Sequence, residues 1–207
     1  MRIRRIWLVL VGVLLSTFSF AQGSSMVEFE RELKQKNHGV ESVRSSFVQT
    51  SELSVLGNKV EKRGSFYYHI PSKLLLQFED GDYIKMNEVA FEMRSAGRVN
   101  SMKAAANPMM KSLNTILSAC VAGDLSTLTR SFTIELTATA EEWILTLQPR
   151  QARMAAHIAR IVISFDRSDM SLNVLRMEQA GGDSVSYRFF RKEFNVELAE
   201  GLFDIVM

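Results

Sequence analysis

The sequence predicts an α+β domain built on a highly curved antiparallel β-sheet whose apolar face is covered by helices. Three observations support this fold class. Many segments alternate apolar and polar side chains, two segments show the helical spacing of apolar residues, and short turn signals separate the strands. Strands joined by tight turns pair antiparallel, and helices against the hollow side of the sheet would bury the apolar faces of all these elements.

The N-terminus has the organisation of a secretory signal peptide. Residues 2–5, RIRR, are basic, Ile6–Leu15 form a short apolar run, and small residues at Ser19 and Ala21 suit cleavage after Ala21. The apolar run is shorter than the roughly 20 residues of a membrane-spanning helix. An uncleaved anchor is the alternative. We therefore expect residues 1–21 to be removed and residues 22–207 to form a single exported domain.

The first half of this domain predicts one helix and five strands. Ser25 and Glu28 have capping-box spacing, and Gly39 can supply a left-handed stop, so the helix is expected over Met26–Asn37. Turn signals at 57–58 and 81–82 separate strands in the segment that follows. The expected strands are Val43–Leu53, Val60–Ile70, Lys73–Glu79, Tyr83–Met86 and Ala90–Arg94.

The stretch GSFYYHIPSKLLLQFEDGD, residues 64–82, shows the strand pattern most clearly. Apolar side chains recur at every second position on either side of Pro71, which predicts two strands that share one apolar face. These side chains are Phe66, Tyr68, Ile70, Leu74, Leu76 and Phe78. The face could be ordinary core packed on a helix, or it could line a cavity for an apolar ligand.

The second half predicts a helix followed by five further strands. Asn107 suits the N-cap, Pro108 the first helical position and Gly123 the end, and Asp124 can cap one more short turn. The apolar stripe of this helix is Met110, Leu113, Leu117, Cys120 and Val121. The expected strands are Phe132–Ala138, Trp143–Gln148, Ile158–Phe165, Leu172–Gln179 and Ser184–Lys192.

Composition and motifs argue against an enzyme, a metal site or a cofactor site. The chain has 25 Lys and Arg against 23 Asp and Glu, and three of the arginines lie in the leader, so no basic excess indicates nucleic-acid binding. Cys120 is the only cysteine and is expected to be a buried thiol. His38, His69 and His157 lack the helical spacing of a metal pair, and no nucleotide-binding loop or nucleophile motif occurs.

Methionine is frequent and only Met1 of the eleven lies in the leader. Met102, Met109 and Met110 fall near the second predicted helix. Methionine fills irregular apolar spaces, so the pattern fits either plain core packing or a pocket for chains of variable shape.

These segments, in their order, resemble the LolA-like family of lipoprotein carriers. The resemblance runs over nearly the whole exported part, and four stretches carry it: VRSSFVQT from Val43, GSFYYHIPSKLLLQFE from Gly64, IARIVISFDRSDMSLNVLRMEQAGGDSVSYRFF from Ile158, and NVELAEGLFDIV from Asn195. The resemblance implies an unclosed half β-barrel with helices over its concave face. It also implies a periplasmic protein that shelters the acyl chains of lipoproteins, or of a related lipid, in a hydrophobic cavity.

The resemblance further implies that the protein receives its cargo from an inner-membrane ABC transporter and delivers it to an outer-membrane acceptor. We expect the protein to be a monomer. The expected cavity residues are Phe47, Phe66, Tyr68, Ile70, Leu74, Leu76, Phe78, Met110, Leu113, Leu117, Trp143 and Leu145. A lipid- or protein-sensing module of the same fold and a lipid hydrolase are the alternatives.

Two positions depart from the family pattern. LolA proper carries an arginine immediately before the hairpin proline, where it is implicated in opening and closing the cavity, and this chain has Ile70 there. The family's Asp-Gly turn before an aromatic strand reads Asn87-Glu88 here. Isoleucine offers no hydrogen-bond donor, so the resemblance predicts that closure relies on an apolar contact of Ile70 with Met110 or Leu113.

Overall fold

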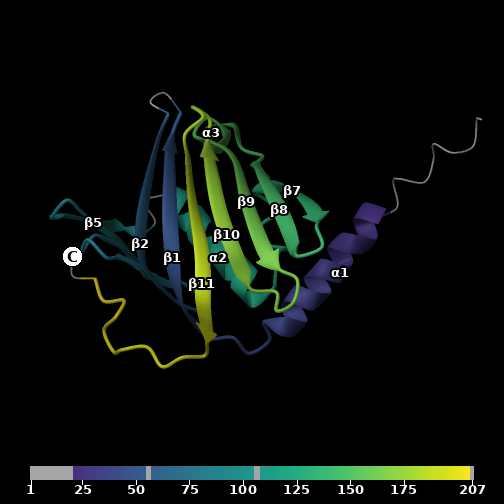
Figure 1. Cartoon of the computed structure of the whole chain (residues 1–207), viewed down its shortest axis with the longest axis horizontal. Helices are drawn as coiled ribbons and strands as arrows, with labels where there is room; N and C mark the ends of the chain where they lie inside the picture. Colours follow the sequence, from purple (N-terminus) through teal and green to yellow (C-terminus); the bar gives the residue numbers. More distant parts are fainter. Residues whose placement is uncertain (1–20, 55–56, 105–107, 206–207) are drawn as a thin grey trace, which may run out of the picture.

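The structure, a computed structural model, describes residues 21–54, 57–104 and 108–205 (Figure 1). The first half of the chain contains α1 (Ala21–Lys36), β1 (Ser42–Leu53), β2 (Asn58–His69), β3 (Lys73–Phe78), β4 (Tyr83–Met86), β5 (Ala90–Ser95) and β6 (Arg98–Lys103). The second half contains α2 (Pro108–Ala122), β7 (Phe132–Ala138), β8 (Glu142–Pro149), α3 (Ala152–Ala155), β9 (Ile158–Asp166), β10 (Leu172–Gln179) and β11 (Ser184–Phe194). Within the described ranges, no helix has the length and apolar character needed to cross a bilayer.

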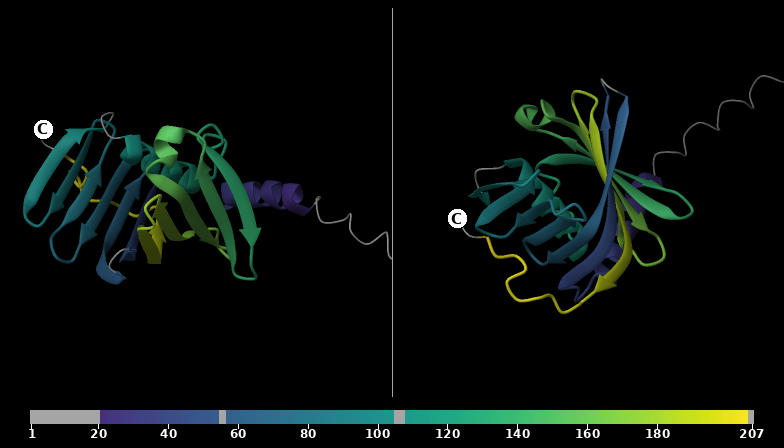
Figure 2. Two further views of the ribbon diagram at one scale, coloured as in Figure 1. Left: turned by 90° about the horizontal axis from the view of Figure 1, so that it is seen from above. Right: turned by 60° about the vertical axis from the view of Figure 1, so that its left-hand side comes forward.

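The described strands form one antiparallel sheet in the order β6-β5-β4-β3-β2-β1-β11-β10-β9-β8-β7. Each half of the chain is a meander of neighbouring hairpins, and pairing of β1 with β11 joins the two halves at the centre of the sheet (Figure 1). The sheet is twisted and curved, and its terminal strands β6 and β7 remain unpaired with each other (Figure 2). The prediction of a large, unclosed antiparallel sheet with few helices is confirmed.

The predicted elements agree closely with the structure, with three exceptions. The first helix begins at Ala21 instead of Met26, so Ser25 lies inside α1 and the predicted capping box is wrong. A Ser-x-x-Glu spacing also occurs in helix interiors, and no proline precedes it to stop the helix. The sequence analysis missed β6 and the four-residue α3. It assigned Met102 to the surroundings of the second helix, but Met102 lies on β6 with 37% of its surface exposed.

The core lies on one face of the sheet, which we call the inner face. Alternate side chains of the strands point there, including Phe47, Phe66, Leu76 and Leu145, and they form one buried cluster with side chains of α1 and α2. In Figure 1, α2 lies behind the sheet, and α1 lies beside β7 and β8. Phe29 of α1 packs against two inner-face rings, with centroids 5.6 Å from Trp143 and 5.3 Å from Phe165.

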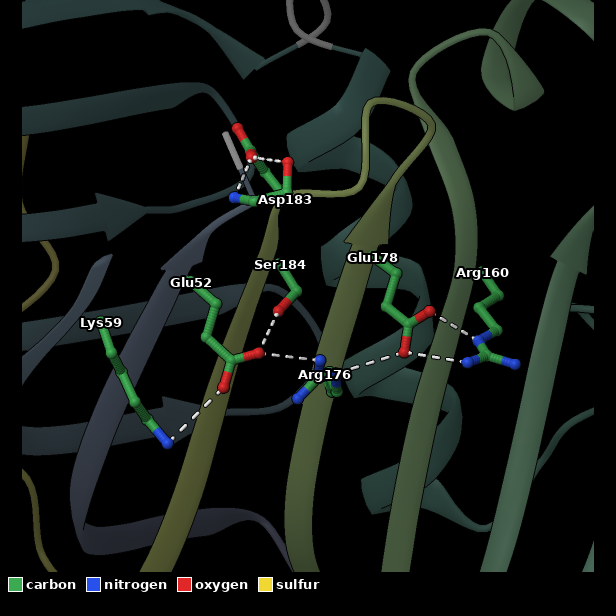
Figure 3. A network of polar contacts seen from close by, with 8 residues as sticks. Glu52, Lys59, Arg160, Arg176, Glu178, Asp183 and Ser184 are labelled. Carbon is green, nitrogen blue, oxygen red and sulfur yellow. Dashed lines mark hydrogen bonds and ion pairs between the residues drawn. The ribbon is translucent and has the colours of Figure 1, made fainter. Parts of the chain in front are cut away.

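The opposite, outer face carries a row of charged side chains over β2, β1, β10 and β9 (Figure 3). Glu52 contacts Lys59 at 3.5 Å and Arg176 at 3.0 Å, and Glu178 links Arg176 at 3.2 Å to Arg160 at 2.7 Å. These side chains are partly or largely exposed to solvent, which screens their charges, so each pair contributes little to the stability of the fold. Their main consequence is a solvated outer face that contrasts with the apolar inner face.

The segment after β11 runs back across the outer face towards β4 and β5 (Figure 1). Lys85 donates to the carbonyl of Asp204 at 2.9 Å, and Asn87 donates to the carbonyl of Phe203 at 3.1 Å. Phe203 is buried, as is Leu75 on β3, whose side chain points to the outer face. Residues 195–205 of the family-like C-terminal stretch therefore form an extended strap that lies against this part of the sheet.

Candidate functional site

The fold brings together eleven of the twelve residues expected to line a cavity. Ten of them belong to the single buried cluster on the inner face: Phe47, Phe66, Tyr68, Leu74, Leu76, Phe78, Leu113, Leu117, Trp143 and Leu145. Ile70 is partly buried and packs against this cluster. The side chain of Met110 lies outside what the structure describes, and so does that of Met109. A contact between Ile70 and Met110 accordingly stays a prediction.

Aromatic rings link the strands of the inner face. The ring of Phe66 stacks on that of Tyr68 at 6.2 Å and lies 5.0 Å from that of Phe189. Phe47 meets Phe78 edge to face at 5.2 Å. One gap in the packing remains beside Phe66 and Phe189.

This gap is a small cavity between the sheet and α2. Its walls are mainly apolar and come from the centre of the sheet, from α2 and from the segment between α1 and β1; they include Val43, Phe66, Leu117, Cys120, Phe165 and Phe189. The cavity measures about 30 Å³. A site of that size holds about two water molecules. This cavity is therefore too small to hold an acyl chain in the arrangement that the structure shows.

A polar contact joins α2 to strand β2 of the sheet. The Ser118 hydroxyl hydrogen-bonds the hydroxyl of Tyr68 on β2, which itself donates to the carbonyl of Pro71 at 2.8 Å. Burial raises the pKa of Tyr68 to about 12, an effect that the Ser118 hydrogen bond partly offsets. Tyr68 thus makes the polar connection between α2 and the β2–β3 hairpin that Ile70 cannot make.

Contacts with α1 hold the C-terminal end of α2. Asn37 donates to the carbonyl of Cys120 at 3.1 Å. Gly123, with φ of 71°, ends the helix in a left-handed conformation, and a Cβ at this position would lie 2.6 Å from the Cα of Lys34. Only glycine combines that dihedral with this approach of two helices. The C-terminal end of α2 is therefore packed closely against the end of α1.

The single thiol lies inside the cluster and has no reactive surroundings. Cys120 is 1% exposed, and burial raises its pKa to about 12. The prediction of a buried thiol is confirmed. Among the described residues, no group of three or more His, Cys, Asp or Glu side chains could hold a metal ion.

Four polar residues at the cavity were not predicted from the sequence: Asn37, Ser45, Ser171 and Lys192. Ser45 alternates with Val43 and Phe47 and could have been assigned to the inner face from that spacing alone. Lys192 could not, because an irregularity in β11 changes the face to which its side chain points.

Comparison with known proteins supports the resemblance inferred from the sequence motifs. Residues 81–183 match the family model described as "Outer membrane lipoprotein carrier protein LolA-like". No curated protein matches the sequence significantly.

Several solved structures resemble this fold at low sequence identity. An uncharacterized conserved protein from Thermus thermophilus superposes with a TM-score of 0.51 at 9% identity, over 86% of this chain and 92% of that chain. A DUF1329 family protein from Desulfovibrio piger gives 0.48 at 11% identity, over 87% and 96% of the two chains. A LolA superfamily protein from Nitrosomonas europaea gives 0.43 at 9% identity, over 89% and 98%.

The structure thus combines a large, unclosed antiparallel sheet with an apolar interior on one of its faces. By that match, residues 81–183 of this chain are similar to the LolA-like family of lipoprotein carrier proteins.

Proposed function

We propose that the protein carries acyl chains of lipoproteins, or of a related lipid, between the inner and outer membranes. The inner face of the sheet would receive the chains, with α1 and α2 as its cover. In this proposal residues 1–21 are a cleaved signal peptide, and residues 22–207 act in the periplasm as a single carrier domain. The donor would be an inner-membrane ABC transporter and the recipient an outer-membrane acceptor, as in the family that the sequence resembles.

The observation that carries this proposal is the single apolar cluster that the inner face of the sheet forms with side chains of α1 and α2. Each acyl CH₂ that leaves water contributes about 0.8 kcal/mol, so a lipid leaves a membrane only for a comparably apolar site. An empty carrier must hide such a site from water. Leu113, Ile116 and Leu117 of α2 pack on the strands and hide it here. An acyl chain that displaced these side chains would replace one apolar contact with another, so opening would cost little net burial.

A pair of neighbouring variants tests acyl binding. Leu76 is buried on the inner face of β3, whereas Gln77 is exposed on the outer face. A lysine at position 76 would put a charge into the proposed site, and a lysine at position 77 would leave the site unchanged. We expect Leu76→Lys to abolish saturable binding of a fluorescent fatty-acyl probe and Gln77→Lys to retain it.

Melting curves recorded in parallel show whether each variant is folded under the binding conditions. If Leu76→Lys is folded and binds the probe as tightly as the wild type does, the inner face is only structural core and the proposal fails. Absence of saturable probe binding by the wild type itself also contradicts it.

A further inference from the structure

The cavity beneath α2 contains a buried hydroxyl that the fold does not use. Ser45 of β1 lines the cavity and is 3% exposed. Its Oγ has no hydrogen-bond partner among the residues that the structure describes. A buried polar atom without a partner costs folding free energy, so such atoms are rare and commonly mark a ligand or an ordered water.

A β-bulge brings a lysine to the same cavity. Arg44 pairs with Glu193 and Ser46 pairs with Phe190, so two residues of β11, Arg191 and Lys192, face the single residue Ser45. Arg191 has a φ of 53°, as expected for the extra residue of a bulge. Regular alternation from the inward-facing Phe189 would direct Lys192 outwards. Because the bulge shifts the alternation by one residue, Lys192 lines the cavity instead.

The amino group of Lys192 is held in a defined position beside the cavity. Its Nζ donates to the Ser171 hydroxyl and to Oδ1 of Asn173. Burial lowers the pKa of Lys192, while Asp169, Asp166 and Glu142 act in the opposite direction. An ammonium group has three N–H bonds, and these two acceptors account for two of them. The cavity is therefore lined mainly by hydrocarbon, and its lining also includes the unpartnered Ser45 hydroxyl and Lys192, whose ammonium group retains one N–H for a further acceptor.

We propose that Ser45 and Lys192 bind the carbonyl oxygen of an acyl ester or amide at the mouth of the cavity. This proposal rests on the proposed acyl-binding function and adds the recognition of the polar end of the chain. The cavity of about 30 Å³ has room for a carbonyl group but not for the chain. The chain itself would enter the space that Leu117 and its neighbours on α2 leave when the helix moves.

The surrounding charges favour a neutral carbonyl over a free carboxylate. Three carboxylates, those of Asp166, Asp169 and Glu142, act on the Lys192 ammonium and already balance its charge. A fourth negative charge would be repelled by them, whereas a neutral carbonyl would still accept the N–H and O–H donors. The ligand class is therefore an esterified or amide-linked acyl chain, and a free fatty acid would bind less well.

Three ligands with the same number of carbons along the chain separate these contributions: methyl palmitate, palmitate and hexadecane. Their affinities for the purified protein follow from displacement of the neutral apolar probe N-phenyl-1-naphthylamine. Lys192→Met keeps the apolar stem and removes the ammonium, Ser45→Ala removes only the hydroxyl, and Lys73→Met on the exposed start of β3 is the matched control. All variants are checked by melting curves.

We expect Lys192→Met to lower the affinity for methyl palmitate about tenfold and Ser45→Ala to lower it about threefold. The effect at Lys192 is larger because a charge-assisted hydrogen bond contributes more than a neutral one. Hexadecane should bind all variants equally, Lys192→Arg should recover most of the ester affinity, and Lys73→Met should have no effect. In the wild type, palmitate should bind more weakly than its methyl ester.

If both Lys192→Met and Ser45→Ala bind methyl palmitate as tightly as the wild type does, the proposed carbonyl site is wrong. Binding of hexadecane by the same proteins would still support the proposed acyl-binding function. Tighter binding of palmitate than of methyl palmitate would overturn the preference for an uncharged head. Failure of the wild type to bind the probe or any of the three ligands would contradict the proposed function itself.

Discussion

Removal of the Tyr68 hydroxyl should separate the opening of α2 from global unfolding. Tyr68→Phe deletes the hydrogen bond from Ser118 and the 2.8 Å bond to the Pro71 carbonyl, and it leaves the stacked ring in place. Each bond contributes about 1 kcal/mol net. The folded state should therefore lose about 2 kcal/mol of stability. Only the Ser118 bond must break when α2 opens, so the opening equilibrium should shift by about 1 kcal/mol, which is about fivefold.

Cys120 is a built-in reporter of this opening because it is the only cysteine and is buried on α2. The assay is the rate of thiol modification by a small neutral disulfide at low urea concentrations, with urea unfolding curves for global stability. Tyr68→Phe and Ser118→Ala should both increase the rate about fivefold. Ser118→Ala should cost only about 1 kcal/mol of global stability, half the loss in Tyr68→Phe.

Tyr83→Phe is the matched control. It also removes a tyrosine hydrogen bond, the 2.8 Å contact with Glu92 on the outer face, and it should leave the Cys120 rate unchanged. The reasoning is refuted if Tyr68→Phe and Tyr83→Phe alter the Cys120 rate equally. It is also refuted if the rate in Tyr68→Phe depends on urea as steeply as global unfolding does, because Cys120 would then be exposed only in the unfolded chain.

Three further predictions concern the fold, its pH dependence and export. In Gly64→Ala the new Cβ would overlap the carbonyl oxygen of Gln77 and lie 2.8 Å from the Phe47 ring. Urea unfolding should therefore show that the free energy of unfolding falls by about 3 kcal/mol. An unchanged free energy of unfolding would contradict this close approach. Hydrogen bonds from Ser168 lower the pKa of Asp166, and the pKa of Glu52 is lowered by hydrogen bonds from Ser184 and Arg176. These two carboxyl groups stabilise the folded state above their unfolded pKa of about 4 and lose that contribution as the pH falls through their lower folded pKa values. The melting temperature should therefore decrease below about pH 4. An increase in melting temperature in that range would contradict the stabilising role of these two carboxylates. The exported protein should begin at Gln22, and N-terminal sequencing that found the arginines of residues 2–5 retained would refute signal cleavage.

Much of the fold follows from periodicity in the sequence. The strand pattern on either side of Pro71 predicted β2 and β3, and the stripe that includes Leu113 and Leu117 predicted the buried side of α2. β6 was missed for two reasons. The two-residue turn that leads into it, Ala96-Gly97, is not one of the strong turn signals in a sequence, and all six residues of the strand are exposed. Such a strand lacks the apolar alternation on which the prediction depends.

The parts of the site that the sequence did not reveal depend on contacts between distant segments. Alternation assigns Leu75 to the polar face of β3, and it is nevertheless buried because the C-terminal segment around Phe203 crosses that face. Lys192 points inwards only because the bulge at Arg191 shifts the alternation of β11. The loss of the family arginine at Ile70 suggested closure by apolar contact alone. The Ser118–Tyr68–Pro71 chain of hydrogen bonds required knowledge of where α2 packs.

The most direct test of acyl binding is native mass spectrometry of the protein purified from the cells that produce it. The proposed function predicts a population with bound lipid, whose released ligand is an acylated molecule. It also predicts that Leu76→Lys, when folded, carries none, whereas Gln77→Lys carries as much as the wild type. A wild-type protein that is entirely lipid-free and that binds no acyl ligand added afterwards would contradict the proposal that the inner face is a lipid-binding interior.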